Sequence, residues 1–304
     1  TEITGGNPLL RREDRRDLKI GLSYEPRAID GLTASANFFR NRASSPISGF
    51  PVLTPEIERA FPGRVVRDAS GRLVSIDSRA INYAASEADE LRLGFNFGRQ
   101  IGGAAGGGRA GLPPGQRMPG AGQGGTGRGG GFGGGPFGGP GKRAQASLFY
   151  TARLKDRIEI APGLPPLDLL NGSATGFLGG ASRHRIDAEA GWFNNGLGIR
   201  AILAWQSGSL VRGGPLPGGG TASDLRFSGL ATINLRFFLN FDQRKSIVEA
   251  LPLLKGSRVS LRINNLGNEI RTVRDEAGLT PLRYQPGYLD PLGRTVEISF
   301  RKLF

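Results

Sequence analysis

The chain alternates apolar and polar residues over long stretches, and this period of two predicts β-strands. In residues 17–25, for example, Leu22 and Tyr24 fall on one face while Ser23 falls on the other. The same alternation recurs in eight further segments. Nine strands are therefore predicted, over residues 17–25, 32–40, 90–98, 144–154, 186–192, 197–205, 225–237, 259–263 and 296–304.

The length of these segments bears on the fold class. A soluble sandwich and a membrane barrel both produce alternation, but many of these strands exceed the usual five or six residues and can cross a bilayer when tilted. Length therefore favours an all-β, antiparallel transmembrane β-barrel, of which about nine strands are present. Aromatic residues near strand ends, at Trp192, Trp205, Phe237 and Phe304, fit interfacial belts, with ordinary core packing as the alternative.

The connections between the strands are asymmetric. If the chain ends on the periplasmic side, one side of the sheet holds four long segments, 42–88, 155–185, 207–224 and 266–292. The other side holds two tight turns, 26–31 and 194–198, together with 100–143 and 239–257, the latter predicted to form a small amphipathic helix. Short turns on one side and long loops on the other are typical of outer-membrane barrels.

Glycine is concentrated in one tract. Residues 101–141 contain 21 of the 50 glycines, three arginines (Arg109, Arg117 and Arg128) and no acidic residue. With almost nothing to bury, this tract is predicted to be a disordered insertion within the barrel portion that spans residues 1–304.

Charge and composition limit the possible chemistry. The 304 residues carry a formal net charge of +14, with no cysteine and one histidine, which excludes disulfides, thiolate sites and multi-histidine metal sites. Asp187 and Glu189 share a strand face and fit a lumen lining better than acid–base catalysis, so neither a catalytic residue nor a cofactor is assigned. The alternative function is a basic nucleic-acid-binding protein with a glycine/arginine-rich segment around 128–130, although Phe132 and Phe137 give it little capacity for stacking.

Several motifs carry a family resemblance. The segment Gly6-Asn7-Pro8-Leu9-Leu10 through Glu13 resembles the G-N-P-x-L-x-x-E segment of TonB-dependent outer-membrane receptors. Residues 61–71 and 81–84 look like loop segments of one subgroup, and 260–274 is similar to a late barrel motif that runs into N-L-F-N. Residues 284–304 look like the last loop and final strand of the family.

Departures from the family pattern are also visible. Residues 266–268 read Leu-Gly-Asn rather than Leu-Phe-Asn, and Lys302 interrupts the final apolar run. No segment resembles the family's N-terminal plug or TonB box, and nine is an odd number of strands whereas bacterial barrels close with even numbers. The resemblance therefore implies the C-terminal part of a receptor barrel that does not form a closed pore by itself.

The resemblance also implies a function and its partners. It implies energised uptake of a scarce nutrient (a ferric siderophore, cobalamin or an oligosaccharide) across the outer membrane of a Gram-negative bacterium. The partners would be outer-membrane lipid and lipopolysaccharide, the TonB complex acting through a plug, the barrel-assembly machinery and a small nutrient ligand, with no nucleic acid.

Two sets of residues are candidates for these roles. Ligand binding is assigned to basic residues of the long loops, Arg64, Arg67, Arg72, Arg183, His184 and Arg212, because a basic mouth favours anionic ligands. The alternative is that these arginines pair with lipopolysaccharide phosphates or with nearby acids. The assembly signal is assigned to Val296, Ile298, Phe300 and Phe304, because a terminal aromatic residue on an alternating strand resembles the signal read by the insertion machinery; packing of Phe304 at the bilayer edge is the alternative.

Overall fold

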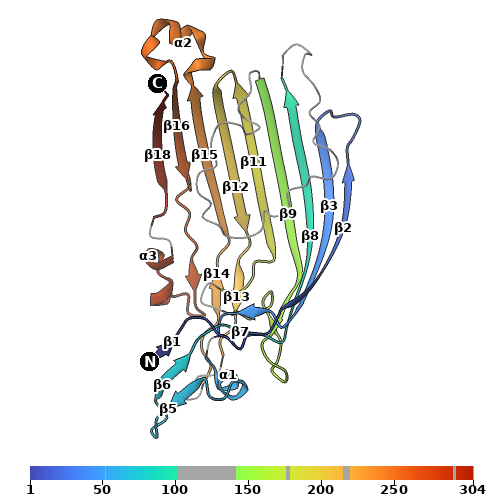
Figure 1. Ribbon diagram of the computed structural model, residues 1–304, viewed down its shortest axis with the longest axis vertical. Helices are drawn as coiled ribbons and strands as arrows, with labels where there is room; N and C mark the ends of the chain where they lie inside the picture. The colour runs from blue at the N-terminus through green and yellow to red at the C-terminus, as the bar shows by residue number, and fades with distance from the viewer. Residues whose placement is uncertain (52, 102–141, 176–178, 215–219, 290–291, 304) are drawn as a thin grey trace.

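The computed structural model describes residues 1–51, 53–101, 142–175, 179–214, 220–289 and 292–303, and it is dominated by one large curved antiparallel sheet (Figure 1). Its strands pair in the order β18-β16-β15-β12-β11-β9-β8-β3-β2, and a short strand, β10, adds to β9. Along this path the strands are β2 (Asp14–Tyr24), β3 (Leu32–Ser44), β8 (Ala85–Gln100), β9 (Lys142–Glu159), β11 (His184–Asn194), β12 (Leu197–Gln206), β15 (Leu230–Asn240), β16 (Ser257–Asn264) and β18 (Thr295–Lys302), with β10 at Leu167–Asp168.

Eight of the nine predicted strands are confirmed as strands of this path, and most are longer than the alternation alone indicated; the ninth, predicted over 225–237, is confirmed only in its second part, β15. β9 has 18 residues and β8 has 16. The register is continuous along every pair except for one irregularity between Asp89 and Glu90. The path ends at β2 and β18, and among the described residues these two strands do not pair with each other. The sheet is therefore open at both edges.

The connections fall into two groups, as predicted. The tight-turn end is the end of the sheet where β2 joins β3, β11 joins β12 and β15 joins β16, and the loop end is the opposite one (Figure 1). At the turn between β11 and β12, Asn195 and Gly196 have φ values of 42° and 88°. Two successive positive φ values match the twist of a two-residue hairpin, which explains the Asn-Gly pair there.

The loop end carries three small sheets. Their strands are β1 (Glu2–Ile3), β5 (Val65–Arg67) and β6 (Leu73–Asp77) in the first, β4 (Ile47–Ser48) and β7 (Ile81–Asn82) in the second, and β13 (Ser209–Val211), β14 (Leu225–Phe227) and β17 (Val273–Arg274) in the third. The prediction of one strand over 225–237 is therefore wrong. The backbone breaks at Ser228–Gly229, so that β14 joins a loop sheet while β15 joins the main sheet.

The helices are short. They are α1 (Pro55–Ala60), α2 (Lys245–Ala250), α3 (Pro286–Leu289) and the 3₁₀ turns η1 (Phe241–Gln243), η2 (Pro252–Leu254) and η3 (Leu282–Tyr284). The Thr54 hydroxyl accepts a hydrogen bond from the Ile57 amide, and Pro55 lies in the first turn of α1, both of which favour a helix start. The helix predicted within 239–257 is confirmed only as the six residues of α2 between two 3₁₀ turns.

The buried core lies at the loop end. Ile57, Ile81, Tyr83 and Ile160 form its centre, and partly buried apolar side chains such as Phe50 surround them. The phenol of Tyr83 donates a hydrogen bond to the Gly49 carbonyl (2.9 Å). Burial raises the pKa of Tyr83 above its usual value. The glycine-rich tract between β8 and β9 lies outside the described residues, apart from Ile101.

Candidate functional site

The large sheet has one apolar and one polar face. Because directly paired residues share a face, the registers align the apolar positions of all nine strands into one surface, here called the apolar face. The apolar face comprises Ile20, Leu22, Tyr24, Leu32, Ala34, Ala36, Phe38, Leu91, Leu93, Phe95, Phe97, Ala144, Ala146, Leu148, Tyr150, Ile186, Ala188, Ala190, Trp192, Leu197, Ile199, Ala201, Leu203, Trp205, Ala231, Ile233, Leu235, Phe237, Leu239, Val259, Leu261, Ile263, Val296, Ile298 and Phe300.

Nothing in the described structure covers the apolar face. On interior strands Phe95 is 50% exposed and Leu148 43%, and on the edge strand β18 Ile298 is 74% exposed. Within the described strands, no large side chain of this face is buried. A soluble two-layer fold would bury such a face against a second layer. The uncovered surface, which spans nine strands, is also much larger than the apolar patches that monomeric soluble proteins expose.

Aromatic residues mark both ends of the apolar face. Trp192 pairs with Ile199, which in turn pairs with Phe237. The rings of Trp192 and Phe237 therefore lie in one row near the tight-turn end. Trp205 pairs with Ile186, which pairs with Tyr150, and this row lies nearer the loop end of β11 and β12. The predicted girdle residues Trp192, Trp205 and Phe237 therefore lie toward the margins of the apolar surface rather than in a packed core, and Phe304 lies outside the described residues.

The opposite face, here called the polar face, is basic over its C-terminal strands. β12, β15, β16 and β18 place five arginines there, Arg200, Arg236, Arg258, Arg262 and Arg301, against one acid, Glu297. The registers align Arg200 with Arg236 and Arg236 with Arg262, which makes a row of three guanidinium groups on adjacent strands.

Acidic residues lie at both ends of this arginine row. Arg200 donates to Glu189 of β11 (2.7 Å), and Arg262 donates to Glu297 of β18 (2.8 Å). The central Arg236 has an arginine as register partner on each side. Three arginines and two paired acids leave the row with a formal net charge of +1, and a net positive charge attracts anions.

The N-terminal half of the polar face is also partly basic, and two of its arginines contact other groups of the sheet. The guanidinium of Arg92 lies over the ring of Phe149, 4.3 Å from its centroid, and Arg153 pairs with Glu90 (3.0 Å). Both contacts hold the cations against the sheet surface.

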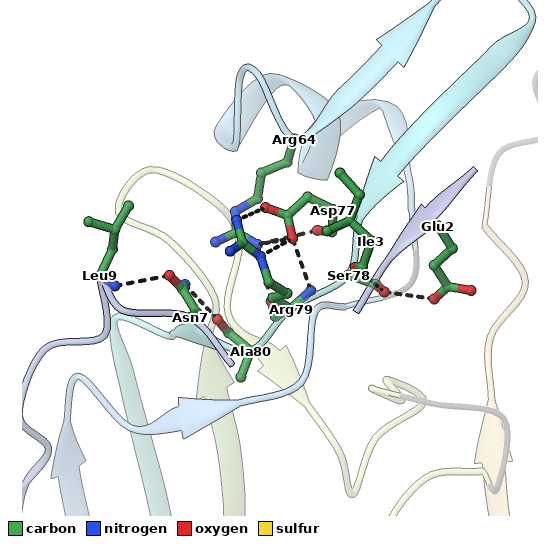
Figure 2. Close-up of polar contacts among 9 residues, drawn as sticks. All are labelled: Glu2, Ile3, Asn7, Leu9, Arg64, Asp77, Ser78, Arg79 and Ala80. Carbon is green, nitrogen blue, oxygen red and sulfur yellow. Dashed lines mark hydrogen bonds and ion pairs between the residues drawn. The ribbon is translucent and has the colours of Figure 1, made fainter. Parts of the chain in front are cut away.

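At the loop end, Arg64 holds the β1-β6-β5 sheet together (Figure 2). Its guanidinium donates to the carbonyl oxygens of Asp77 (3.2 Å) and Arg79 (3.1 Å), lies over the Phe50 ring, and forms an ion pair with the Asp77 carboxylate (3.5 Å). Arg79 donates two hydrogen bonds to the same carboxylate, each 2.8 Å long. These contacts, chiefly the hydrogen bonds from Arg79, lower the pKa of Asp77 to about 2.

The other two arginines of this predicted group are also paired with acids. Arg67 forms a forked pair with Glu58 (2.9 Å for the closest contact), which lowers the pKa of that glutamate. Arg72 forms an ion pair with Asp68 (3.3 Å), but its side chain is 84% exposed. Of Arg64, Arg67 and Arg72, Arg72 is therefore the most accessible to a ligand.

Arg183 and Arg212 are brought to one turn. The Arg183 guanidinium donates to the side-chain oxygen of Asn171 (3.1 Å), and the Arg212 side chain packs over the backbone of Gly172. Gly172 has φ of 107°, and a side chain there would collide with Arg212. The two arginines thus lie on either side of a turn whose conformation needs glycine.

His184 directly follows Arg183 and begins β11. It pairs with Ala152 in the register, which places it on the side of the sheet that carries the apolar face, and its Nδ1 atom is hydrogen-bonded to the Tyr150 hydroxyl (2.8 Å). The two rings are stacked with centroids 5.9 Å apart. Its predicted role as a ligand-binding residue beside Arg183 is untested.

The predicted assembly residues lie on the edge strand. Val296, Ile298 and Phe300 are on the apolar face of β18, where they are 60%, 74% and 59% exposed. Phe304 lies outside the described residues. The assembly role of all four residues stays a prediction.

The motifs that resemble the receptor family have clear roles in holding loops. The side-chain amide nitrogen of Asn7 donates to the Ala80 carbonyl (2.9 Å), and the side-chain oxygen of Asn7 accepts from the Leu9 backbone amide (Figure 2). Asn82 exchanges hydrogen bonds with the Arg11 backbone. In the Asn-Asn-Leu-Gly-Asn segment, Asn265 and Asn268 adopt φ values of 51° and 55°, a conformation in which asparagine is enriched.

Comparison with known proteins gives matches in structure only. No protein-family model and no curated protein sequence matches the chain. Similar solved structures include the ferric enterobactin receptor PfeA of Pseudomonas aeruginosa (a variant), at 13% identity and a TM-score of 0.48, covering 98% of this chain and 32% of that one. The siderophore receptor PirA of Acinetobacter baumannii is 12% identical with a TM-score of 0.48, covering 99% of this chain and 33% of that one. The FrpB iron transporter of Neisseria meningitidis is 12% identical with a TM-score of 0.48, covering 98% and 32%. The chain thus spans about a third of the length of these proteins.

Two further features concern the part of the chain that the structure describes. No helix there is both long and apolar enough to cross a membrane. No group of three or more His, Cys, Asp or Glu side chains there is arranged to hold a metal ion.

The arginine row on the polar face was missed by the sequence analysis, which placed all of its ligand candidates in loops. The signal is present in the alternation, because Arg200, Arg236 and Arg262 each occupy a polar position of a predicted strand. Only the register shows that the three positions are neighbours.

Proposed function

We propose that this chain is part of an outer-membrane β-barrel receptor of the TonB-dependent type, which takes up a scarce small nutrient. The observation that carries this proposal is the two-faced sheet, whose continuous apolar face is uncovered and whose opposite face carries the arginine row. The motif resemblance of residues 6–13 and 284–304 supports the same class. The nucleic-acid-binding alternative accounts for the charge but not for the exposed apolar face.

Strand length supports a membrane location. At about 3.3 Å per residue and a tilt of about 40°, ten residues rise about 25 Å, the height of the apolar band of a transmembrane barrel. Of the seven interior strands, β3, β8, β9, β11, β12 and β15 have ten residues or more, whereas β16 has eight. In this arrangement the apolar face meets lipid, and its aromatic margins lie at the two interfaces.

The open edges imply further strands. Lipid cannot hydrogen-bond the free backbone groups of an edge strand, so an open sheet is not stable in the hydrocarbon region. We infer that β2 and β18 pair with other strands in the membrane, which closes a barrel around the polar face.

The arrangement also suggests an orientation and a ligand class. The tight-turn end faces the periplasm and the loop end faces outward, where the loops meet lipopolysaccharide. The arginine row then lines the aqueous interior, and Arg72, Arg183 and Arg212 lie at the mouth, so an anionic nutrient is favoured. A ferric catecholate complex, which is strongly anionic, fits better than cobalamin or a neutral oligosaccharide.

The remaining partners follow from this class. Energy would come from the TonB complex acting through a plug, and the barrel-assembly machinery would act on the strand that holds Val296, Ile298 and Phe300. In this arrangement His184 faces the lipid side, next to Tyr150, and contributes to the interface rather than to the ligand site.

Uptake by whole cells tests the proposal. Cells producing the receptor are given a labelled ferric catecholate siderophore, cyanocobalamin or a maltooligosaccharide, with the inner-membrane motor present or deleted. We expect motor-dependent accumulation of the ferric complex. Failure of all three probes to accumulate in a motor-dependent way would contradict the proposal.

Two arginine variants locate the ligand contacts. Loss of one charge-assisted hydrogen bond costs about 1.5–3 kcal/mol, so Arg236→Gln or Arg72→Ser should weaken binding by roughly 10- to 100-fold if the ligand contacts that residue. Arg59→Ser is a matched control, because Arg59 is 77% exposed on α1 and pairs with Glu56 in the same loop. Equal affinities for all variants would remove both arginines from the ligand site.

A further inference from the structure

The connection between β15 and β16 is unlike the other described turns at its end of the sheet. Between Phe241 and Gly256 it holds η1, α2 and η2, whereas β11 and β12 are joined by two residues (Figure 1). Its two ends are tied together, because the Gly256 amide donates to the Asp242 carboxylate (2.7 Å). The Leu303 amide also donates to the Gly256 carbonyl (2.9 Å). The connection is thus anchored to the sheet.

The part of this connection around η2, here called the leucine turn (Leu251–Leu254), exposes apolar side chains. Leu253 is 75% exposed and Leu251 is 57% exposed, and Pro252 between them is exposed as well. Two exposed leucines in one short turn form a small apolar surface that needs a partner.

The leucine turn lies at the margin of the apolar face. Lys302 comes two residues after Phe300 on β18 and pairs with Ser257, so it projects from the same side of the sheet as Phe300. The Lys302 ammonium group donates to the Leu253 carbonyl (2.9 Å). The row below contains Leu239, Val259 and Phe300. The exposed leucines therefore continue the apolar face beyond its last row.

Basic residues surround the leucine turn. Lys245 and Lys255 are exposed on either side of it in the sequence, and Lys302 bonds to its backbone, while Asp242 and Glu249 are exposed acids of the same connection. Leucines flanked by lysines are suited to the boundary between acyl chains and anionic headgroups, because the leucines enter the apolar layer while the ammonium groups reach the phosphates.

We propose that the leucine turn is an interfacial membrane anchor, which seats in the headgroup region of the phospholipid leaflet at the tight-turn end of the sheet. This rests on the proposed function, in which the apolar face meets lipid. Continuity with that face is the reason for choosing phospholipid as the occupant rather than a partner protein. The proposal assigns a lipid-binding surface to a segment that does not cross the bilayer.

Site-directed fluorescence tests the anchor, and the 304 residues contain no cysteine that would interfere with labelling. Single cysteines are introduced as Leu253→Cys, Leu148→Cys and Asn195→Cys and labelled with an environment-sensitive dye. The labelled protein is reconstituted in vesicles of phosphatidylethanolamine and phosphatidylglycerol. Leu148 reports on the apolar face itself, while Asn195, exposed in the neighbouring β11–β12 turn, is the matched aqueous control.

Each label is then exposed to a nitroxide attached near the top of the acyl chain and, separately, to iodide in the water. We expect the Leu253 label to be quenched several-fold more by the lipid nitroxide than the Asn195 label is, and to be protected from iodide. Lipid contact at Leu148 with water exposure at Leu253 would overturn the anchor and leave the proposed function standing. Water exposure at Leu148 would overturn the proposed function and the anchor with it.

Discussion

A charge placed on the apolar face separates a membrane-spanning sheet from a soluble one. Leu148 lies in the middle part of β9, an interior strand, and is 43% exposed without lipid. Its neighbour Ser147 points to the polar face and pairs directly with Glu189. The variants Leu148→Arg and Ser147→Arg therefore add the same charge one residue apart, on opposite sides of the sheet.

The expected magnitudes differ strongly between the two environments. An arginine facing lipid near the bilayer midplane costs about 2–4 kcal/mol in a transmembrane barrel, which corresponds to a folding equilibrium roughly 30- to 900-fold weaker. At a partly exposed position in water the same change stays within about 0.5 kcal/mol. Ser147→Arg places its charge beside a carboxylate on the aqueous face, so a change of no more than about 1 kcal/mol is expected.

Reversible urea unfolding in vesicles measures this difference. Both tryptophans, Trp192 and Trp205, lie on the apolar face, so their fluorescence reports when that face leaves lipid. We expect a clearly lower unfolding midpoint for Leu148→Arg and a nearly unchanged one for Ser147→Arg. Equal midpoints would refute the assignment of the apolar face to lipid.

Three further predictions concern packing and charge. The pKa of Asp77 is lowered to about 2, so its ion pairs stabilise the loop sheet fully above about pH 4 and progressively less as the pH falls to about 2. The variant Asp77→Asn should therefore remove about 2 kcal/mol or less of this stability at neutral pH. Hydrogen exchange of the β6 amides measures the loss. Gly198→Ala should lower the free energy of unfolding by about 1–3 kcal/mol, because its methyl group would overlap the Phe238 ring. Adding Phe238→Ala in the same chain should relieve the overlap. If the losses of the two single variants simply add in the double variant, the contact is contradicted. Ile57→Ala should destabilise the buried loop core by about 2–5 kcal/mol and leave the exchange of β12 unchanged; loss of protection in both would show that the two regions unfold together.

The main sheet could be predicted from the sequence because each strand is two-faced over its whole length. Alternation then reports both the strand and which of its sides is apolar and which is polar, without any knowledge of the partner strand. The division between long loops and tight turns followed directly from the strand positions.

Alternation failed where it continued through a break. Residues 225–237 keep their period of two across Gly229, yet the chain changes sheet there. A Cβ atom at Gly229 would lie 3.0 Å from the backbone oxygen of Gln206. Two backbone segments therefore approach each other closely at the point where the strand is interrupted. Such an approach depends on residues distant in the sequence, and periodicity carries no trace of it.

At the candidate site, too, contacts between residues distant in the sequence could not be predicted from the pattern. The sequence left open whether Arg64 and Arg67 bind a ligand or pair with nearby acids; in the structure they pair with Asp77 and Glu58, 13 and 9 residues away along the chain. The arginine row could be read only from the pairing registers. Helix α1, in contrast, was missed although Thr54 and Pro55 give a local start signal.

The buried loop core and the uncovered apolar face give this chain two separate sources of cohesion. Water drives Ile57, Ile81, Tyr83 and Ile160 together at the loop end, while in the proposed arrangement the apolar face of the sheet is covered only by lipid or detergent. In the proposed arrangement, urea weakens both regions, while depletion of the amphiphile weakens the second alone. A single melting temperature would describe neither, and the stability of this chain is better expressed as two numbers, each quoted with its solvent.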